Sequence, residues 1–531
     1  MSHDINELSI LKCLGKTVSD PLKPVLTFVN DDGSDERLSW QDIFENTNRM
    51  ARILAQYGIG KGDTFTMIMR NHPEFLYALF AALSLGAIAV PIDPRSKGKK
   101  LSFQILNTQS KGILAEDVFL ENLKEIHDDI KQVPVVGILY KNHHHIPVNT
   151  NYPILNEIMK AQDPTIPSQV VPLDHSAPAQ IIHTSGTTGD PKGVVLKAER
   201  FMIYGFMSSF LWNYQEDDVV YTGLSMTHGN AQSVTVFPAL SKGIMGVVSE
   251  RFTKSKIWDI CRKYGCTTFS LLGGMMAGIY NEPVKANDAD NPVRRVVSAG
   301  TPRAIWESFE KRFGVKIHEW YAAVEGGLAH NPPGTAPVGS FGKPPQGMLE
   351  MKIVDENDNE LPLGAKGELI SRIASGETTV TYYGKEEASK EKTRGGWLRS
   401  GDICHQDKDG FFYFDFRKGG GIRRQGDFIQ PDYVEKVIGE NQTVSEVCVY
   451  GIPSESGAPG ESDLVAAVAP FEGKEIDIGS IKADCLKGLE RNSIPTYIQI
   501  VKDIPKTVSE KPLERILRDE FKKDAPNVVT L

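Results

Sequence analysis

Short apolar runs with strand character alternate with amphipathic, helix-like segments along most of this chain. Residues 39–59 place apolar side chains at helical spacing, with a serine at the start and a glycine near the end. Residues 63–69 then indicate a strand, 73–86 a helix and 87–93 a second strand. Strands that are separated by helices pair in parallel sheets, which carry helices on both faces. The alternation therefore predicts an α/β fold.

The pattern changes after about residue 336, where strand-like runs follow one another closely. Residues 348–372 hold two such runs around the turn-rich "DENDNELPLG", which indicates a β-hairpin. A further strand is expected at 409–416, and the glycine-rich segment 417–428 is suited to a hinge. We therefore expect a large N-terminal domain at 1–416, with parallel-rich sheets and a β subdomain. A small, mobile α+β domain is expected at 417–531.

Length, charge and hydropathy limit the classes of protein to consider. With 531 residues, the chain exceeds what one hydrophobic core usually supports. Its formal net charge of −9 disfavours nonspecific binding to nucleic acid. No apolar run reaches the roughly 18 residues that a transmembrane helix needs, and the first residues lack the basic and apolar pattern of a secretory signal. We expect a cytoplasmic monomer or homodimer, with neither nucleic acid nor membrane as a partner.

The cysteines and histidines do not predict a metal centre. The six cysteines form no CxxC pair, so the usual zinc and redox spacings are absent and reduced thiols are expected. Three consecutive histidines at 143–145 lie in a polar, turn-rich stretch, where we do not expect a metal site.

A glycine- and hydroxyl-rich loop follows an apolar run in "IIHTSGTTGDPKGV" (181–194). Glycines let backbone amides approach a phosphate closely, and serine and threonine hydroxyls add donors. A Walker loop would need glycine where this chain has Pro191, so that motif is excluded. A generic glycine-rich turn is the alternative interpretation. The residues that we expect to contact phosphate are Thr184, Ser185, Gly186, Thr187, Thr188 and Lys192.

This loop resembles the signature of the acyl-adenylate-forming superfamily, which includes acyl-CoA synthetases, adenylation domains of peptide synthetases, and luciferases. Further segments resemble other motifs of the superfamily, in the superfamily's order, and together they span nearly the whole chain. These segments are "SAGTP" (298–302), "EWYAAVEGG" (319–327), "GWLRSGD" (396–402), "DFRKGGGIRRQGDFIQP" (415–431) and "PKTVSEKPLER" (505–515).

The resemblance implies a site for ATP and Mg²⁺. Glu325 is the carboxylate that would hold magnesium, a cation that prefers oxygen ligands, although a solvated surface charge is the alternative. Tyr321 would stack on adenine, Asp402 would accept the ribose hydroxyls, and Arg417 would contact the same sugar. Tyr321 could equally be a core residue, and Arg417 simply exposed. The remaining nucleotide contacts that the resemblance implies are Gly300, Thr301 and Trp320.

Lys511 is the lysine that the resemblance assigns to adenylate formation. A carboxylate attacks the α-phosphate of ATP, and because both reactants are anions, the transition state needs concentrated positive charge. Lys506 is the nearest alternative. Several departures from the family's motifs put efficiency in doubt. Val324 stands where the family has threonine, and Gly420 stands at the hinge position. The other departures are Ala322, Ser400 and Glu510.

The resemblance also implies a thiol acceptor. The chain ends soon after Lys511 without a carrier domain, which favours free coenzyme A. In the ligases of the superfamily, the small domain rotates and the loop after the hinge lines the path of the thiol. Gly426 would let pantetheine pass near the backbone, and Arg423 or Arg424 could meet coenzyme phosphates, with exposed surface arginines as the alternative.

Residues 225–267 resemble the crotonobetaine/carnitine-CoA ligase branch, and His228 lies where the family often has a residue beside the acyl pocket. A packed core histidine is the alternative. The pocket looks compact and partly polar, which disfavours a long fatty acid. Its candidate residues are His228, Asn230, Gly273, Gly274, Met275 and Ser298.

The leading hypothesis is therefore an ATP- and magnesium-dependent carboxylic acid:CoA ligase for a small or medium acid, such as an aromatic, dicarboxylic or carnitine-like acid. One alternative is a stand-alone adenylating enzyme that loads a separate carrier protein. The other alternative is a noncatalytic nucleotide-binding protein.

Overall fold

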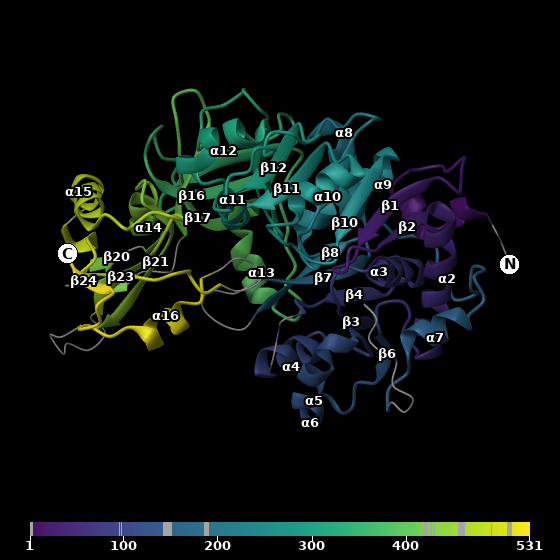
Figure 1. The fold of residues 1–531 in the computed structure, drawn as a ribbon. Coiled ribbons are helices and arrows are strands. Elements are labelled where there is room, and N and C mark those ends of the chain that lie inside the picture. Colours follow the sequence, from purple (N-terminus) through teal and green to yellow (C-terminus); the bar gives the residue numbers. More distant parts are fainter. Residues whose placement is uncertain are drawn as a thin grey trace. The chain divides into compact units, whose positions relative to one another are not determined.

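The structure is a computed structural model (Figure 1). It describes residues 4–94, 96, 98–141, 151–184, 191–417, 422–424, 427–429, 431–454, 462–489, 491–506 and 512–531. Two compact units are recognised and are described separately. The first unit comprises Met1–Ser270, Pro292–Arg295 and Val380–Glu391, and the second comprises Leu271–Asn291, Val296–Thr379 and Lys392–Leu531.

The first unit contains a six-stranded sheet in the order β6-β5-β3-β4-β7-β8. All of its neighbouring strands pair in parallel except β7 and β8, which form an antiparallel pair. This arrangement confirms the parallel-rich α/β fold expected from the alternating pattern. The strands are β3 (Thr64–Ile68), β4 (Ile88–Pro91), β5 (Ile113–Glu116), β6 (Val135–Leu139), β7 (Pro178–Thr184) and β8 (Lys192–Lys197).

Local signals explain where the helices beside this sheet begin and end. Helix α2 (Trp40–Gln56) starts with a capping box, in which Ser39 and Asp42 satisfy each other's backbone amides. Helix α3 (Pro73–Leu85) ends at Gly86, whose φ of 67° is easy only for glycine.

Three helices pack against the apolar face of this sheet and lie together in Figure 1. Their side chains join those of the strands in one buried cluster, so the sheet has a closed core on this face. The helices are α4 (Gly98–Asn107), α5 (Leu120–Glu125) and α6 (His127–Ile130).

The first unit also contains strands in the order β2-β1-β10-β9-β11, of which only β1 and β2 pair in antiparallel fashion. A π-helix (η3, Ala231–Val236) interrupts the path from β9 to β10. The strands are β1 (Pro24–Val29), β2 (Asp35–Ser39), β9 (Val219–Thr222), β10 (Met245–Ser249) and β11 (Thr268–Leu272). The helices among them are α8 (Glu199–Phe210), α9 (Phe237–Lys242) and α10 (Ile257–Tyr264).

The second unit holds strands β12 (Arg295–Ala299), β13 (Lys316–Ala323) and β14 (Gly326–Asn331), with helices α11 (Gly273–Tyr280) and α12 (Trp306–Phe313). An antiparallel four-stranded sheet follows, which is the expected β subdomain and includes the expected hairpin. Its strands are β15 (Leu349–Val354), β16 (Gly367–Ile373), β17 (Leu398–Gln406) and β18 (Phe412–Arg417).

The end of the chain forms the expected α+β arrangement. A mixed sheet in the order β21-β22-β23-β24 buries its apolar residues against α14 and α15 on one side and α16 on the other. The strands are β21 (Val444–Pro453), β22 (Ser462–Pro470), β23 (Tyr497–Ile500) and β24 (Val528–Thr530). The helices are α14 (Pro431–Gly439), α15 (Ile478–Gly488) and α16 (Glu514–Glu520).

The second compact unit joins this final segment with the β subdomain and with β12–β14. It therefore does not divide at residue 417, the last residue of β18, and the predicted domain boundary there stays a prediction. Within the described part of the chain, every helix is too short or too polar to span a lipid bilayer. The three histidines at 143–145 lie outside the described residues.

Candidate active site

The predicted phosphate loop connects β7 to β8. Ser185, Gly186, Thr187 and Thr188 lie outside the described residues. The flanking residues Thr184 and Lys192 are paired opposite each other in the ladder, and the Thr184 hydroxyl donates to the Lys192 carbonyl oxygen at 3.4 Å. The loop therefore leaves and re-enters the sheet at one point, as a cradle requires.

Two features of the loop's base were not anticipated from the sequence. The Lys192 ammonium lies 5.1 Å from the centre of the Tyr382 ring, in a cation–π contact. Burial, with a smaller effect of the nearby Lys100 charge, lowers the pKa of His183 to about 4. The imidazole beside the loop is therefore neutral near pH 7.

The predicted adenine segment is held by a buried carboxylate. Glu319 accepts hydrogen bonds from the backbone amides of Gly300 at 2.6 Å and Thr301 at 3.2 Å. The Thr301 hydroxyl donates to Ser298 Oγ at 2.7 Å. Burial raises the pKa of Glu319 to about 8, although the hydrogen bonds from Thr301 and Gly300 act in the opposite direction. Glu319 opens the segment 319–327 that resembles a family motif, but the resemblance assigned it no role.

A close backbone contact supports the same segment. A Cβ atom added at Gly273 would lie 1.9 Å from the carbonyl oxygen of Gly300, so only glycine fits at position 273 in this arrangement. Gly300 itself has a φ of 76°, which also favours glycine. Gly273 was predicted as a pocket residue, and the structure brings it together with the predicted adenine segment.

The predicted ribose and adenine residues meet directly. The Tyr321 hydroxyl donates to Asp402 Oδ2 at 2.6 Å, and the Tyr321 ring stacks on Phe341 with centroids 4.7 Å apart. Asp402 is paired with Arg417 in the ladder of β17 and β18. Trp320 is buried and, as the neighbour of Tyr321 in a strand, it points to the other face of β13. A contact between Trp320 and the nucleotide stays a prediction.

Glu325 lies in the turn between β13 and β14 and lines a hollow with Tyr321, Lys392 and Arg399. The Arg399 guanidinium forms an ion pair with Asp358 at 2.6 Å, which fixes it at the wall of the hollow. Magnesium usually takes one or two protein carboxylates and completes its shell with phosphate and water oxygens. A single carboxylate in a hollow beside Tyr321 fits that donor set.

The predicted acyl-pocket residues are divided between the two compact units. His228 and Asn230 belong to the first unit, in the turn that leads from β9 into the π-helix. Gly273, Gly274 and Met275 begin helix α11 in the second unit, and the Met275 side chain is buried.

The predicted catalytic lysine and coenzyme loop are described only in part. Lys511 and Gly426 lie outside the described residues, and Arg423 is described only through its backbone, in the short hairpin of β19 (Ile422–Arg424) and β20 (Asp427–Ile429). The segment that contains Lys511 is flanked by Lys506 and Pro512, which form a β-bridge with each other. Lys506 is in an ion pair with Glu446.

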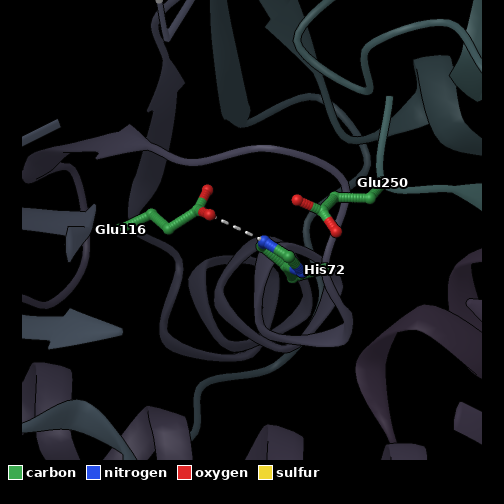
Figure 2. A group of neighbouring side chains, drawn as sticks. All are labelled: His72, Glu116 and Glu250. Atoms are coloured by element: carbon green, nitrogen blue, oxygen red, sulfur yellow. Dashed lines mark ion pairs between the residues drawn. The ribbon is translucent and has the colours of Figure 1, made fainter. Parts of the chain in front are cut away.

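Figure 2 shows a buried group of side chains that no local pattern revealed: His72, Glu116 and Glu250. Their potential ligand atoms lie within 4.8 Å of one another, with His72 Nε2 3.2 Å from Glu116 Oε1. However, the guanidinium of Arg70 contacts both carboxylates, with its Nε 2.8 Å from Glu116. Burial would raise the pKa of Glu116, but hydrogen bonds and charges from His72 and Arg70 lower it to about 2. Arg70 is thus the resident cation, and the group is best described as an ion-pair network.

Comparisons with known proteins agree with this geometry. The model of the AMP-binding enzyme family matches residues 18–383, and that of the AMP-binding enzyme C-terminal domain matches residues 433–511. The two matches lie on either side of the predicted domain boundary.

Individual relatives have low sequence identity to this chain. The crotonobetaine/carnitine–CoA ligase of Salmonella heidelberg (strain SL476) is 27% identical over 509 residues, which cover 93% of this chain and 96% of that protein. A benzoate CoA ligase from Burkholderia xenovorans LB400 has the same fold, with a TM-score of 0.82, 20% identity and coverage of 96% and 99% of the two chains. An anthranilate CoA ligase in complex with anthranoyl-AMP gives a TM-score of 0.81, 20% identity and 96% coverage of both chains. Because the first family model covers well over half of its length, this chain belongs to the AMP-binding enzyme family.

Proposed function

We propose that this protein is an ATP- and magnesium-dependent carboxylic acid:CoA ligase that activates a small or medium organic acid. The hydrogen bond between Tyr321 and Asp402 is the observation that carries the proposal. It joins two family motifs that lie 81 residues apart. This supports a site in which Asp402 would accept from the ribose and the Tyr321 ring would stack on adenine. Family membership and the fold shared with CoA ligases support the same reaction class.

In the first half-reaction, a carboxylate oxygen of the acid attacks the α-phosphorus of ATP. The bond between this phosphorus and the oxygen that bridges it to the β-phosphate breaks, and pyrophosphate leaves. Thr184 and Lys192 hold the ends of the loop that would bind phosphate. Lys511 supplies positive charge between the two anions. Magnesium, held by Glu325, would neutralise phosphate charge.

In the second half-reaction, the thiolate of coenzyme A attacks the acyl carbon, a thioester forms and AMP leaves with the electron pair of the acyl–oxygen bond. Arg423 and Gly426 are proposed to line the path of the thiol. The two half-reactions need different arrangements of the small domain, and a hinge near Gly420 would permit the change.

The names of the relatives limit the identity of the substrate acid only in part. Their names refer to crotonobetaine, carnitine, benzoate and anthranilate, which are all compact acids. We propose an acid of this size, whether aromatic, dicarboxylic or carnitine-like. Free coenzyme A is the proposed acceptor, and a separate carrier protein is the alternative.

Exchange of labelled pyrophosphate into ATP, driven by a panel of carboxylic acids, tests the proposal. At least one compact acid should support exchange, and addition of coenzyme A should convert that acid to its thioester. Exchange without a thioester would favour the carrier-loading alternative. Absence of exchange with every acid would overturn the proposed activity and favour a noncatalytic nucleotide-binding protein.

A further inference from the structure

Asn230 has a buried side-chain amide that lacks hydrogen-bond partners in the described part of the chain. Both Oδ1 and Nδ2 are shielded from solvent, and neither forms a hydrogen bond with any residue that the structure describes. A buried polar group without a partner costs about 1–3 kcal/mol, so nearly all such groups in folded proteins are satisfied. An amide left in this state at a predicted pocket position points to a bound molecule that satisfies it.

The position of Asn230 in the fold strengthens this inference. It lies two residues after His228 and immediately before the π-helix Ala231–Val236, and short π-helical segments are frequent at functional sites. Gln232, only 1% exposed, uses its Nε2 to donate to the Met226 carbonyl oxygen at 2.7 Å. Its Oε1 is also buried without a partner in the described part of the chain. Two side-chain amides two positions apart, at Asn230 and in the π-helix, therefore have hydrogen-bonding capacity that no described residue uses.

Asn71 holds this turn in place. Its Nδ2 donates to the carbonyl oxygens of Leu224 at 2.8 Å and Ser249 at 2.9 Å, and its Oδ1 accepts the amide of Met226 at 2.8 Å. Asn71 is 2% exposed, so these bonds are sheltered from water. The turn that carries Asn230 is consequently anchored before any ligand arrives, which reduces the entropic cost of binding.

The ion-pair network that includes the residues of Figure 2 holds the chain segments on which Asn71 and its partner Ser249 lie. Arg70 and His72 are the chain neighbours of Asn71, and both contact Glu116. Glu250 directly follows Ser249, whose carbonyl oxygen binds Asn71. The residues on both sides of the anchor are thus held by buried charges within the same compact unit.

We propose that the amide of Asn230 binds a polar group of the substrate acid, so that this protein prefers acids that carry a hydroxyl or a carboxamide besides the reacting carboxylate. This inference rests on the proposed function. A hydroxyl or a carboxamide can both accept from Nδ2 and donate to Oδ1. A purely hydrocarbon acyl group would leave the amide unsatisfied and would be rejected for that reason.

The first test measures stability without any substrate. Asn230→Leu replaces an unsatisfied amide by an apolar group of similar size, so its melting temperature should equal or exceed that of the wild type. Asn48→Leu is the control, because Asn48 is 2% exposed and its amide donates to the Pro164 carbonyl oxygen at 3.0 Å. The control should melt at a lower temperature. A decrease of the same size for Asn230→Leu would show that the amide has partners within the protein, and would overturn the inference.

The second test measures acid preference in matched pairs, such as lactate with isobutyrate and para-hydroxybenzoate with para-methylbenzoate. Among the pairs that are substrates, kcat/KM of the wild type should favour the polar member by about 100-fold or more. Asn230→Leu should reduce that ratio by about 100-fold, whereas Asn48→Leu should leave it unchanged. Equal turnover of both members by the wild type would overturn the inference and leave the ligase activity established. If no acid is activated, the proposed function fails. The melting temperatures, together with calorimetric binding of the paired acids, then decide whether Asn230 binds a polar group.

Discussion

The hydroxyl of Tyr321 donates a hydrogen bond of 2.6 Å to Asp402 across 81 residues of sequence. The bond ties β13 to β17, and both residues lie on the second compact unit. Burial first, and the neighbouring Asp402 charge next, hold the pKa of Tyr321 well above its usual value. The phenol therefore remains a donor at every physiological pH, and the carboxylate keeps a fixed orientation.

Replacing Tyr321 by phenylalanine should weaken both the fold and the site. A buried hydrogen bond to a charged acceptor contributes about 1.5–3 kcal/mol, so we expect a loss of that order in the free energy of unfolding. KM for ATP should rise, because Asp402 loses its orientation, while KM for the acid should change little. Denaturant titration and steady-state kinetics measure these effects.

Tyr413→Phe is the matched control for this change, because the Tyr413 hydroxyl donates to Asp407 Oδ2 at 3.0 Å in the same unit. It should reduce stability without raising KM for ATP. An unchanged KM for ATP in Tyr321→Phe would remove Asp402 from the nucleotide site.

Glu319 should make stability depend on pH in an unusual direction. Its pKa is raised from 4.5 to about 8 in the folded protein. Between these values the folded protein retains a proton that the unfolded chain has lost, so stability falls as pH rises from about 4.5 to about 8. Each such group contributes a slope of about 1.4 kcal/mol per pH unit inside the window.

Glu319→Gln should reduce the slope of unfolding free energy against pH between pH 5 and 8 by about that amount. Glu435→Gln offers a comparison, since burial also raises the pKa of Glu435 to about 8 while its carboxylate binds the amide of Val449. Both variants should flatten the profile, but only Glu319→Gln should alter KM for ATP. A profile that keeps its full slope in Glu319→Gln would mean that Glu319 is ionised in the folded state.

Gly273→Ala should displace the predicted adenine segment. The new Cβ would lie 1.9 Å from the Gly300 carbonyl oxygen, so this backbone must move. Overpacking of this kind costs about 1–3 kcal/mol, and we expect an increase of about 10-fold or more in KM for ATP. Gly376→Ala is the control, because a Cβ there meets nothing within 4 Å. Similar kinetics for both variants would show that the contact between Gly273 and Gly300 does not support nucleotide binding.

Lys511→Ala should separate the two half-reactions. Loss of a preorganised charge at the transition state costs on the order of 100-fold or more in rate, so adenylate formation from acid and ATP should be nearly abolished. Thioester formation from preformed acyl-adenylate should persist. Single-turnover measurements of each step provide the comparison.

Lys506→Ala is the internal control for the lysine assignment. Lys506 is in an ion pair with Glu446, so its loss should reduce stability and leave adenylate formation within a few-fold of the wild type. If Lys506→Ala abolishes adenylate formation and Lys511→Ala does not, the catalytic lysine has been misassigned.

The resemblance to the superfamily's motifs proposed the site residues and gave no role to the residues that support them. Gly300, Tyr321 and Asp402 were proposed because each belongs to a short segment that resembles a motif of the superfamily. Glu319 lies two residues before Tyr321, but only its hydrogen bond with the Gly300 amide reveals a role. Asn71 is more than 150 residues from the turn that it anchors, and no periodicity or spacing connects them.

The amino-acid order alone determined the alternation of strands and helices and the positions of the turns. These properties depend on hydrophobic periodicity, glycine and hydroxyl content, which act over a few neighbouring residues. Only the tertiary structure decided that Tyr321 meets Asp402, that Asn71 holds Met226 and that the Asn230 amide has no partner among the described residues. Burial and the satisfaction of polar groups depend on which distant segments pack together, so they emerge only when the chain has folded.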